Sequence, residues 1–528
     1  MDKTQDMLDA LLYSMQELSN RKETENGAIG YQTTNHPLLD LHFTISSMRD
    51  KDKRKLLLDN YFIYLKDHPE EIPDFVAWAF YVRDIRQGIG ERDLFRDILV
   101  RLAKADELDI AKRMKLLIEL VSEYGRFDDL LPLLDKDIPE DIRIAVAYYL
   151  KSILVKDLAL CAHDKLNEIS LCAKWMPSIK TSSKLTMERA KEFCRIIRWE
   201  HRSYRRILSK LREVINIVER NLSAKEYENI TYQHVPSKAM LKYKEAFKRN
   251  DSERFSQYLE DVKSGKAKMN MNVTQPHEIF AEVLENDEAN DPMLIEAWKA
   301  LPKLELTKGF IPIIDASYSM TVHIPGSKYR AMHVALGLGS YLAYNNPSPV
   351  FNHRVLTFSK HPKLVELPVT GDNPYDIAKI YHANSDFMGL NTDIYRAFML
   401  VLNAAVKANI PDDQIPDILI LSDMEFDDNE RYRKYFVDEE DDDKSILMDD
   451  IANKYKDKGY SLPRCIWWNL NSRSMAIPQI KNENGLIMLS GFSQNALKMI
   501  ESNELDPYKV LLETIHSERY QPILDIMK

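Results

Sequence analysis

The spacing of apolar residues changes near residue 303, and this change restricts the fold more than any other feature of the sequence. Before that point, apolar residues recur every three or four positions, as in DKRKLLLDNYFIYLKDH and PEDIRIAVAYYLKSILVKDLAL, which indicates amphipathic helices. After it, short apolar runs alternate with amphipathic stretches, a pattern typical of α/β proteins. Because 528 residues exceed the size of one hydrophobic core, we predict a multidomain protein, with domains at residues 1–302 and 303–528.

The predicted helices of the first domain are separated by short breaks that carry Gly, Pro or Asn, such as RQGIGERD and KDIPED. Many helices of roughly 12 to 20 residues with short connections favour antiparallel helix pairs stacked in an all-α, HEAT-like solenoid. No fixed sequence period is visible, so any repeat is degenerate. A compact helical bundle is the structural alternative.

The second domain contains short apolar runs that we predict to be strands. They are FIPIID (310–315), HRVLTFS (353–359), KLVELP (363–368), PDILILSD (416–423), RCIWWNL (464–470) and GLIMLSG (485–491). Apolar strands that alternate with helices favour a mostly parallel, Rossmann-like sheet covered on both faces. The runs within 353–368 read as a hairpin that supplies one antiparallel edge. Pro312 is awkward in a central strand because proline cannot donate a ladder hydrogen bond.

Oxygen-bearing side chains lie at several predicted strand ends and helix starts. The candidate metal ligands are Asp315, Ser317, Ser319, Thr392 and Asp423. Ligands bind at the carboxyl ends of parallel strands, and alternate residues of an extended loop point the same way. An oxygen set without Cys or His suits Mg²⁺ or another divalent cation, which would compensate an otherwise costly buried aspartate. The alternative is that these residues are only helix caps and turn residues.

Basic residues are concentrated in part of the helical domain although the net charge of the chain is −10. Residues 174–268 carry 23 Lys and Arg against 12 Asp and Glu, whereas residues 412–457 carry 6 against 17. The candidate RNA-contacting residues are Arg195, Arg198, His201, Arg202, Arg205, Arg206, Lys210 and Lys242. Several of these guanidinium groups share one helical face, where they repel one another unless an anion such as phosphate binds them. The segment therefore predicts a polyanion partner.

Some residues of this basic stretch have two interpretations. Trp199 and Tyr204 could stack on bases, which contributes roughly 1–3 kcal/mol per base, or they could pack in the core. The arginines could bind phosphate or could pair with Glu188, Glu192 and Glu200. The second basic stretch, SKAMLKYKEAFKRN, either continues a phosphate-binding surface or is a solvated helix face.

Other features argue against several classes of protein. No run of 18 apolar residues occurs, so we expect no membrane-spanning helix. Four cysteines without CxxC spacing argue against a disulfide framework or a zinc site and favour the reducing cytoplasm. Neither G-x-S-x-G nor HExxH occurs, so we expect no enzyme. A metal-dependent phosphohydrolase that uses Asp315 and Asp423 remains the enzymatic alternative, although no evident nucleophile or general base lies beside them.

DASYSM, a threonine ahead of a helix, and ILILSD resemble the metal-ion-dependent adhesion site (MIDAS) of von Willebrand factor A domains. The resemblance covers about residues 303–528. It implies that the five candidate ligands surround one Mg²⁺. It also implies an open coordination position that receives a carboxylate from a protein partner.

RDIRQGIGERDLFRDIL, EYGRFDDLL and WEHRSYRRILSKLR are similar to segments of the Ro autoantigens. In that family a TROVE module, a ring of helical repeats, is closed by an A domain. The order of the two parts is that of the same family, and KWMPS and VPSKAMLKYKEAF are similar to signatures of an uncharacterised Ro-like group. Ile89 stands where the family has lysine. The resemblance implies that His201 and its basic neighbours line an RNA-contacting surface of the ring.

Together these features predict a non-enzymatic, Ro-like RNA-binding protein of the cytoplasm. Single-stranded ends or structured small RNA would bind the basic helices. The Mg²⁺ site would stabilise the closing domain or recruit a partner. The alternative is a metal-dependent protein-interaction scaffold, such as an assembly or viral structural factor, that binds no RNA.

Overall fold

The computed structural model describes most of the chain from residue 20 to the C-terminus. The residues not described are 1–19, 106–109, 216, 286–289, 308, 360–361, 384–393, 427–446, 478–485 and 502–505. The chain forms two compact units. The α/β unit comprises residues up to Leu57 and Thr274–Thr514, and the helical unit comprises Leu58–Val273 and Ile515–Lys528.

The division predicted between residues 302 and 303 does not coincide with these units. The N-terminal segment and the helices just before residue 303 belong to the α/β unit, and the last residues of the chain belong to the helical unit. Packing between segments that are distant in sequence causes the difference. Helix α2 (Pro37–Phe43) packs against strand β8 (Leu486–Ser490), and α22 (Gln521–Met527) packs against α4 (Ile72–Arg83).

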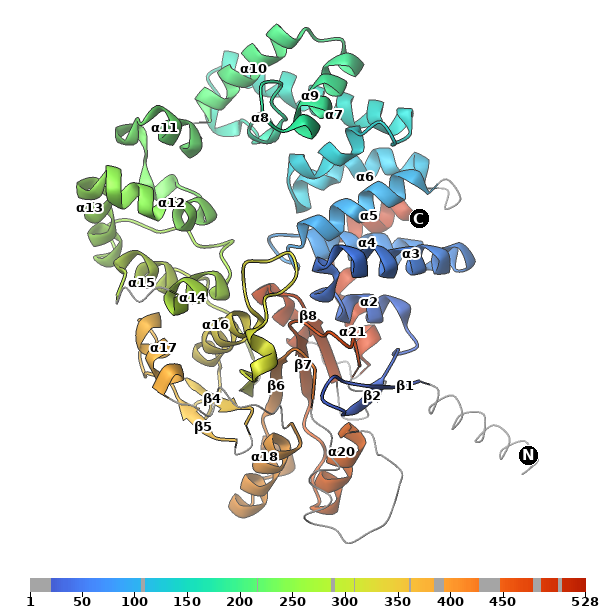
Figure 1. Cartoon of the computed structure of the whole chain (residues 1–528), viewed down its shortest axis with the longest axis vertical. Helices are drawn as coiled ribbons and strands as arrows, with labels where there is room; N and C mark the ends of the chain where they lie inside the picture. The colour runs from blue at the N-terminus through green and yellow to red at the C-terminus, as the bar shows by residue number, and fades with distance from the viewer. Residues whose placement is uncertain are drawn as a thin grey trace. The chain divides into compact units, whose positions relative to one another are not determined.

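The α/β unit is built on a six-stranded sheet, shown in Figure 1. Its strands are β3 (Phe310–Ile314), β4 (Arg354–Thr357), β5 (Leu364–Glu366), β6 (Asp417–Ser422), β7 (Cys465–Asn469) and β8 (Leu486–Ser490). They lie in the order β5-β4-β3-β6-β7-β8, and within this sheet only β5 runs antiparallel to its neighbour. The predicted mostly parallel sheet with one antiparallel edge is confirmed.

Pro312 is accommodated in the central strand by the direction of its backbone nitrogen. The N–H of Asp315 donates to the carbonyl of Leu421 in β6 at 3.0 Å. Since successive residues of a strand point their N–H groups to opposite neighbours, the nitrogen of Pro312 faces β4. Pairing between β3 and β4 begins only at Ile313. The proline therefore lies just before the paired part of that side of β3.

A short hairpin in the N-terminal segment was not predicted. Strands β1 (Arg21–Glu23) and β2 (Ile29–Tyr31) pair antiparallel. The backbone N–H of Tyr31 also donates to the carbonyl of Ile477 at 2.7 Å. The prediction that residues 1–302 are mainly helical is confirmed, and this hairpin is an addition to it that is stabilised by segments several hundred residues away.

Helices cover the sheet of the α/β unit. They are α2, α14 (Pro276–Glu285), α15 (Pro292–Lys299), α16 (Ala331–Tyr344), α17 (Pro374–Ala383), α18 (Ile394–Ala408), α20 (Leu447–Asp457) and α21 (Pro507–Ile515). Helix α16 is almost entirely buried and packs against both β3 and α14. Gly337 permits this close packing, because a Cβ there would lie 2.8 Å from the Cα of His277 in α14.

The helical unit consists of helices that pack on their neighbours in sequence. They are α3 (Lys51–Asp67), of which residues 51–57 are assigned to the α/β unit, α4, α5 (Arg92–Lys104), α6 (Ala111–Tyr124), α7 (Glu140–Ala162), α8 (Cys172–Trp175), α9 (Lys184–Ile197), α10 (His201–Val214), α11 (Val218–Ala224), α12 (Ser237–Asn250), α13 (Ser252–Lys263) and, from the end of the chain, α22. Helix α4 packs on α5, α6 on α7, α7 on α9, and α12 on α13. The predicted succession of packed helices is confirmed, and the closed ring implied by the Ro resemblance stays a prediction.

Two of the strings that resemble Ro autoantigens form a buried ion-pair network. Arg83 is 2% exposed and binds the fully buried carboxylate of Asp129 at 2.7 Å. Arg96 binds the other oxygen of Asp129 at 2.8 Å. A Cβ on Gly125 would lie 2.5 Å from this carboxylate, so the position requires glycine. In this chain the RDIRQGIGER and EYGRFDD strings therefore contribute to helix packing.

A second network holds the end of the chain within the helical unit. Arg519 Nε donates to Asp84 Oδ2 at 2.9 Å, and its Nη1 pairs with Glu123 at 2.9 Å. The hydroxyl of Tyr520 donates to the same fully buried Asp84 at 3.2 Å. Ile89, which stands where the resembling Ro segment has lysine, is also buried, and burial favours an apolar side chain there.

Among the helices that the structure describes, none combines the length and apolar character needed to cross a membrane. The four cysteines are free thiols, and Cys172, Cys194 and Cys465 are buried.

Candidate functional site

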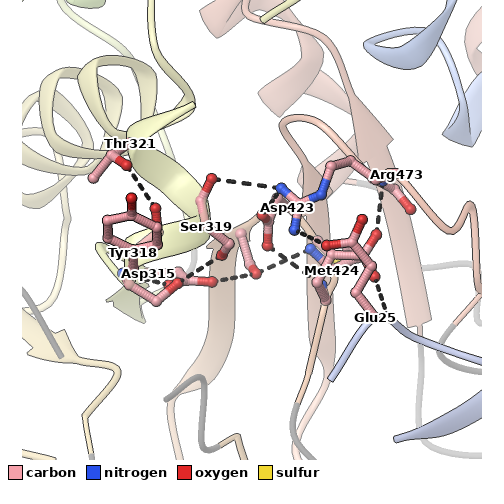
Figure 2. Close-up of polar contacts among 12 residues, drawn as sticks. Glu25, Asp315, Tyr318, Ser319, Thr321, Asp423, Met424 and Arg473 are labelled. Atoms are coloured by element: carbon pink, nitrogen blue, oxygen red, sulfur yellow. Dashed lines mark hydrogen bonds and ion pairs between the residues drawn. The ribbon is translucent and has the colours of Figure 1, made fainter. Parts of the chain in front are cut away.

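Two buried carboxylates lie at the carboxyl ends of the adjacent strands β3 and β6. Asp315 directly follows β3, Asp423 directly follows β6, and both are fully buried. The two strands pair in parallel along their whole length, with Ile314 opposite Leu421. Figure 2 shows the two side chains on neighbouring strand ends, together with Ser319 and Arg473. The structure therefore brings two of the predicted strand ends to one place.

The loop after β3 folds around the carboxylate of Asp315. Its Oδ1 accepts a hydrogen bond from the backbone N–H of Ser317 at 3.0 Å. Its Oδ2 accepts one from the hydroxyl of Ser422 at 2.6 Å. The hydroxyls of Ser317 and Ser319 lie 2.9 Å apart, so the alternate spacing places both serines on the same side. Burial raises the pKa of Asp315, and the hydrogen bonds from Ser422 and Ser317 offset part of this rise.

Asp423 pairs with an arginine that the sequence did not indicate. Arg473 Nη1 lies 3.0 Å from Asp423 Oδ2. Its Nη2 lies 2.6 Å from Glu25 in the turn of the β1–β2 hairpin. Burial and the nearby charge of Asp315 raise the pKa of Asp423 to about 7, although Arg473 acts in the opposite direction. The buried aspartate was predicted to have a cationic partner, and Arg473 supplies part of that charge.

The side chain of Glu425 binds backbone groups of two segments that are distant in sequence. It is fully buried. Its Oε1 accepts hydrogen bonds from the backbone N–H groups of Arg473 and Ser474, both at 2.7 Å. Its Oε2 accepts a hydrogen bond from the backbone N–H of Glu25 at 2.8 Å. Asn26 donates to the carbonyl of Glu425 at 2.6 Å. The carboxylate thus joins the hairpin turn and the loop after β7 to the end of β6.

The charges at this edge of the sheet fit an additional cation. Asp315, Asp423 and Glu425 are buried together, and Arg473 is the only cation among the described residues that contact them. A divalent ion bound by carboxylate and hydroxyl oxygens would compensate the remaining negative charge. Within the described residues, no three His, Cys, Asp or Glu side chains form a metal-binding group by themselves. An ion here would therefore depend on the hydroxyls of Ser317 and Ser319.

One predicted ligand and one predicted segment cannot be placed. Thr392 lies outside the described residues, as does its neighbour Asp393. Most of the acidic insertion at 424–443 is also outside them. The three residues that sequence reasoning missed, Arg473, Glu425 and Glu25, lie near strand ends or in a hairpin turn. A signal was available for Glu425, which alternates with Asp423 after the same strand, and for Arg473, which follows the end of β7.

The candidate RNA-contacting residues lie in the helical unit, mostly on α9 and α10. The side chains of Arg195, Arg198, His201, Arg202, Arg205, Arg206, Lys210 and Lys242 are all exposed. The opposite face of α10 is buried through Tyr204, Leu208 and Leu211. The predicted shared basic face of this helix is therefore present. We use the term basic face for the exposed basic side chains of this stretch, which are Arg198, His201, Arg202, Arg205, Arg206 and Lys210.

The one acid within the stretch of the basic face is Glu200, which is exposed at the N-cap of α10 and forms no ion pair with the basic side chains described there. Arg195 pairs with Glu192 at 2.8 Å, as one alternative predicted. Glu188 instead lies 4.0 Å from Lys184. Among the described residues, the side chains of the basic face itself show no ion pair or hydrogen bond. Its positive charge is thus left to solvent, counterions or a ligand.

The two aromatic residues of this region differ in exposure. Tyr204 is fully buried, packs on Phe193, and donates its hydroxyl to the carbonyl of Pro177 at 2.7 Å. The suggestion that Tyr204 stacks on bases is wrong, because its ring belongs to the core. Trp199 is only half-buried, and its ring meets that of Phe193 edge-on, with centroids 6.4 Å apart.

Comparison with known proteins finds relatives for both units. A family model described as a domain of unknown function (DUF7788) matches residues 310–519, and another (DUF2828) matches residues 180–301. An uncharacterized protein of Acanthamoeba polyphaga mimivirus is 28% identical over 542 residues, covering 96% of this chain and 89% of that protein. Among solved structures, the Deinococcus radiodurans RO (RSR) protein is similar over 85% of this chain and 93% of its own, at 16% identity and a TM-score of 0.41.

Proposed function

We propose that this chain is a non-enzymatic, Ro-like RNA-binding protein of the cytoplasm. The observation that supports the proposal is the basic face of α10, whose exposed cations have no acidic partner among the described residues. Closely spaced guanidinium groups repel one another, and phosphate groups relieve this repulsion through charge-assisted hydrogen bonds. The segment resemblance to Ro autoantigens suggests single-stranded ends or structured small RNA as ligands.

The strand-end site would bind Mg²⁺ in this proposal. Asp315, Ser317, Ser319 and Asp423 would hold the ion, with Thr392 as a further candidate from a segment that the structure does not describe. The ion would supply positive charge to a buried acidic cluster and an open position for a partner's carboxylate. Arg473 would favour the charged form of Asp423 and would hold the hairpin turn beside the site through Glu25.

The RNA proposal is tested by a salt titration with a charge-matched control. The variant Arg202→Ala/Arg205→Ala/Arg206→Ala removes three cations of the basic face. We expect it to lose roughly 10-fold or more of the affinity for single-stranded RNA at low salt. The slope of log K against log salt should fall by about 2, because each lost phosphate contact on a single strand contributes about 0.7.

The control variant is Lys51→Ala/Lys55→Ala/Lys66→Ala, which removes three exposed cations from α3. It changes the net charge equally but should leave both affinity and slope near those of the wild type. Equal losses in the two variants would mean that only net charge matters. Absence of measurable wild-type binding to any RNA would overturn the proposal.

A protein-interaction scaffold is the second candidate function, and one observation favours it. Tyr318 is 72% exposed and Val322 is 47% exposed in or beside the loop that carries Ser317 and Ser319. An apolar rim beside a cation site suits a protein partner that contributes a carboxylate. Two results together would favour this function. A purified protein partner would bind the wild type in Mg²⁺ but would not bind Asp315→Ala, and the wild type would bind no RNA.

A further inference from the structure

An exposed aromatic ring on α7 lies in the same unit as the basic face. Tyr148 is 50% exposed in the middle of this helix. Helix α7 packs against both α9 and α10, and Figure 1 shows the three helices grouped together. Nothing in the local sequence distinguishes Tyr148 from the other apolar residues of a long amphipathic helix.

Lys151 connects Tyr148 to Trp199. Its Nζ lies 5.4 Å from the centroid of the Tyr148 ring and 6.0 Å from that of the Trp199 ring. Both distances are within the range of cation–π contact. One lysine therefore lies between two aromatic rings on a single surface, although the rings belong to residues 51 positions apart in the sequence.

The Trp199 ring packs against a buried phenylalanine ring of α9. Phe193, a fully buried residue of α9, meets it edge-on at an interplanar angle of 89°. Trp199 is thus anchored on the core while part of its side chain remains accessible. A ring held in this way loses little conformational entropy when another flat group stacks on it.

The charge around these rings favours a polyanion over an apolar protein segment. Arg198, which precedes Trp199, is exposed and ends α9 in the left-handed conformation with φ of 57°. Arg198 is the first residue of the basic face, and the next is His201 at the start of α10. Exposed aromatic rings that alternate with cations are the arrangement by which proteins bind single-stranded nucleic acid, with stacked bases and neutralised phosphates.

We propose that Tyr148 and Trp199 form a base-stacking surface for single-stranded RNA, with Lys151 placed to contact the intervening phosphate. This inference rests on the proposed RNA-binding function and specifies which form of RNA this region selects. Duplex RNA cannot use such a surface, because its bases are already stacked within the helix. Tyr148 takes the stacking role that burial denies to Tyr204.

The test compares a short single-stranded RNA with a duplex of the same length. Tyr148→Ala removes the exposed ring without changing charge. It should weaken single-strand binding by about 5- to 150-fold and should leave duplex binding and the salt slope unchanged. Tyr148→Phe keeps the ring and should restore most of the affinity. Ile63→Ala, which truncates a 60% exposed apolar residue on α3, is the matched control and should have no effect.

The outcomes separate this inference from the function on which it rests. Wild-type binding that is unaffected by Tyr148→Ala would overturn the stacking surface but not RNA binding. Equal weakening of single-strand and duplex binding would also overturn the stacking surface, because the variant would then have lost a contact that both forms of RNA use. Absence of wild-type binding to either RNA would overturn both. Tyr148 lies on the surface, so the far-ultraviolet circular dichroism of the variant should match the wild type.

Discussion

At the scale of single residues, two buried aspartates differ in how their charge is compensated. Asp129 is fully buried and is matched by both Arg83 and Arg96. Asp423 is equally buried but shares the single guanidinium of Arg473 with other acids. Removing a carboxylate from the first network would leave a buried cation unpaired and would be destabilising. At the second site burial raises the pKa of both Asp315 and Asp423, so a bound cation that favours their charged forms would stabilise the fold.

This difference predicts that Mg²⁺ stabilises the wild-type protein through Asp315. At a free concentration about 100 times Kd, a single bound ion stabilises the folded state by about 2.7 kcal/mol. The melting temperature of the α/β unit should therefore rise by roughly 5 to 10 °C in saturating MgCl₂. Asp315→Ala should abolish this rise, as measured by differential scanning calorimetry with MgCl₂ and with EDTA.

The control for the magnesium prediction is Asp413→Ala, which removes an exposed acidic residue from the loop before β6. This variant should keep the full stabilisation. A rise of the same size in Asp315→Ala would show that the ion binds elsewhere. No rise in the wild type at any concentration would contradict the proposed site and would leave Arg473 as the compensating charge.

At the scale of helices and strands, predictability from sequence follows the range of the stabilising contacts. The strands β3, β6 and β7 were predicted within a residue or two, because buried parallel strands read as continuous apolar runs. The β1–β2 hairpin was missed because its partners lie beyond residue 420. Tyr204 was open to either interpretation, although its spacing with Leu208 and Leu211 already marked the buried stripe of α10.

Helix α2 carries a buried histidine that should make stability depend on pH. His42 is fully buried where α2 packs on β8, and burial lowers its pKa to about 4 from 6.5, despite a hydrogen bond with the backbone of Met488. The unfolded chain then binds more protons than the folded one between these values. Stability is therefore fully present above about pH 6.5 and falls as the pH drops toward 4, by about 3 kcal/mol.

Urea denaturation at a series of pH values measures this loss, and His42→Leu provides the comparison. The leucine variant cannot take up the proton, so its stability should fall less over the same range. His382→Ala, which removes an exposed histidine from α17, should follow the wild type. If wild type and His42→Leu lose stability equally, the acid sensitivity arises from other groups.

At the scale of the whole molecule, each end of the chain belongs to the unit opposite to the one that its position in the sequence suggests. The N-terminal segment contributes α2 and the β1–β2 hairpin to the α/β unit, and the C-terminal segment contributes α22 to the helical unit. The change in apolar spacing near residue 303 reports secondary structure correctly. It cannot report which helices pack on the sheet, because such contacts depend on the fold rather than on neighbouring residues.

This organisation predicts that the fragment of residues 303–528 does not fold cooperatively by itself. Without α2 and α14, the apolar faces of β8 and α16 would be exposed, and the buried side chains of Leu38, Leu39 and Phe43 would be lost from the core. We expect the fragment to lack a cooperative thermal transition and to bind a hydrophobic dye. The matched comparison is a chain that joins residues 1–57 to 274–514 through a flexible linker, which contains the complete α/β unit. This chain should unfold in one cooperative transition, because every element that packs on the sheet is present. Cooperative unfolding of the shorter fragment, with a circular dichroism spectrum like that of the linked chain, would contradict the assignment of the N-terminal segment to this unit.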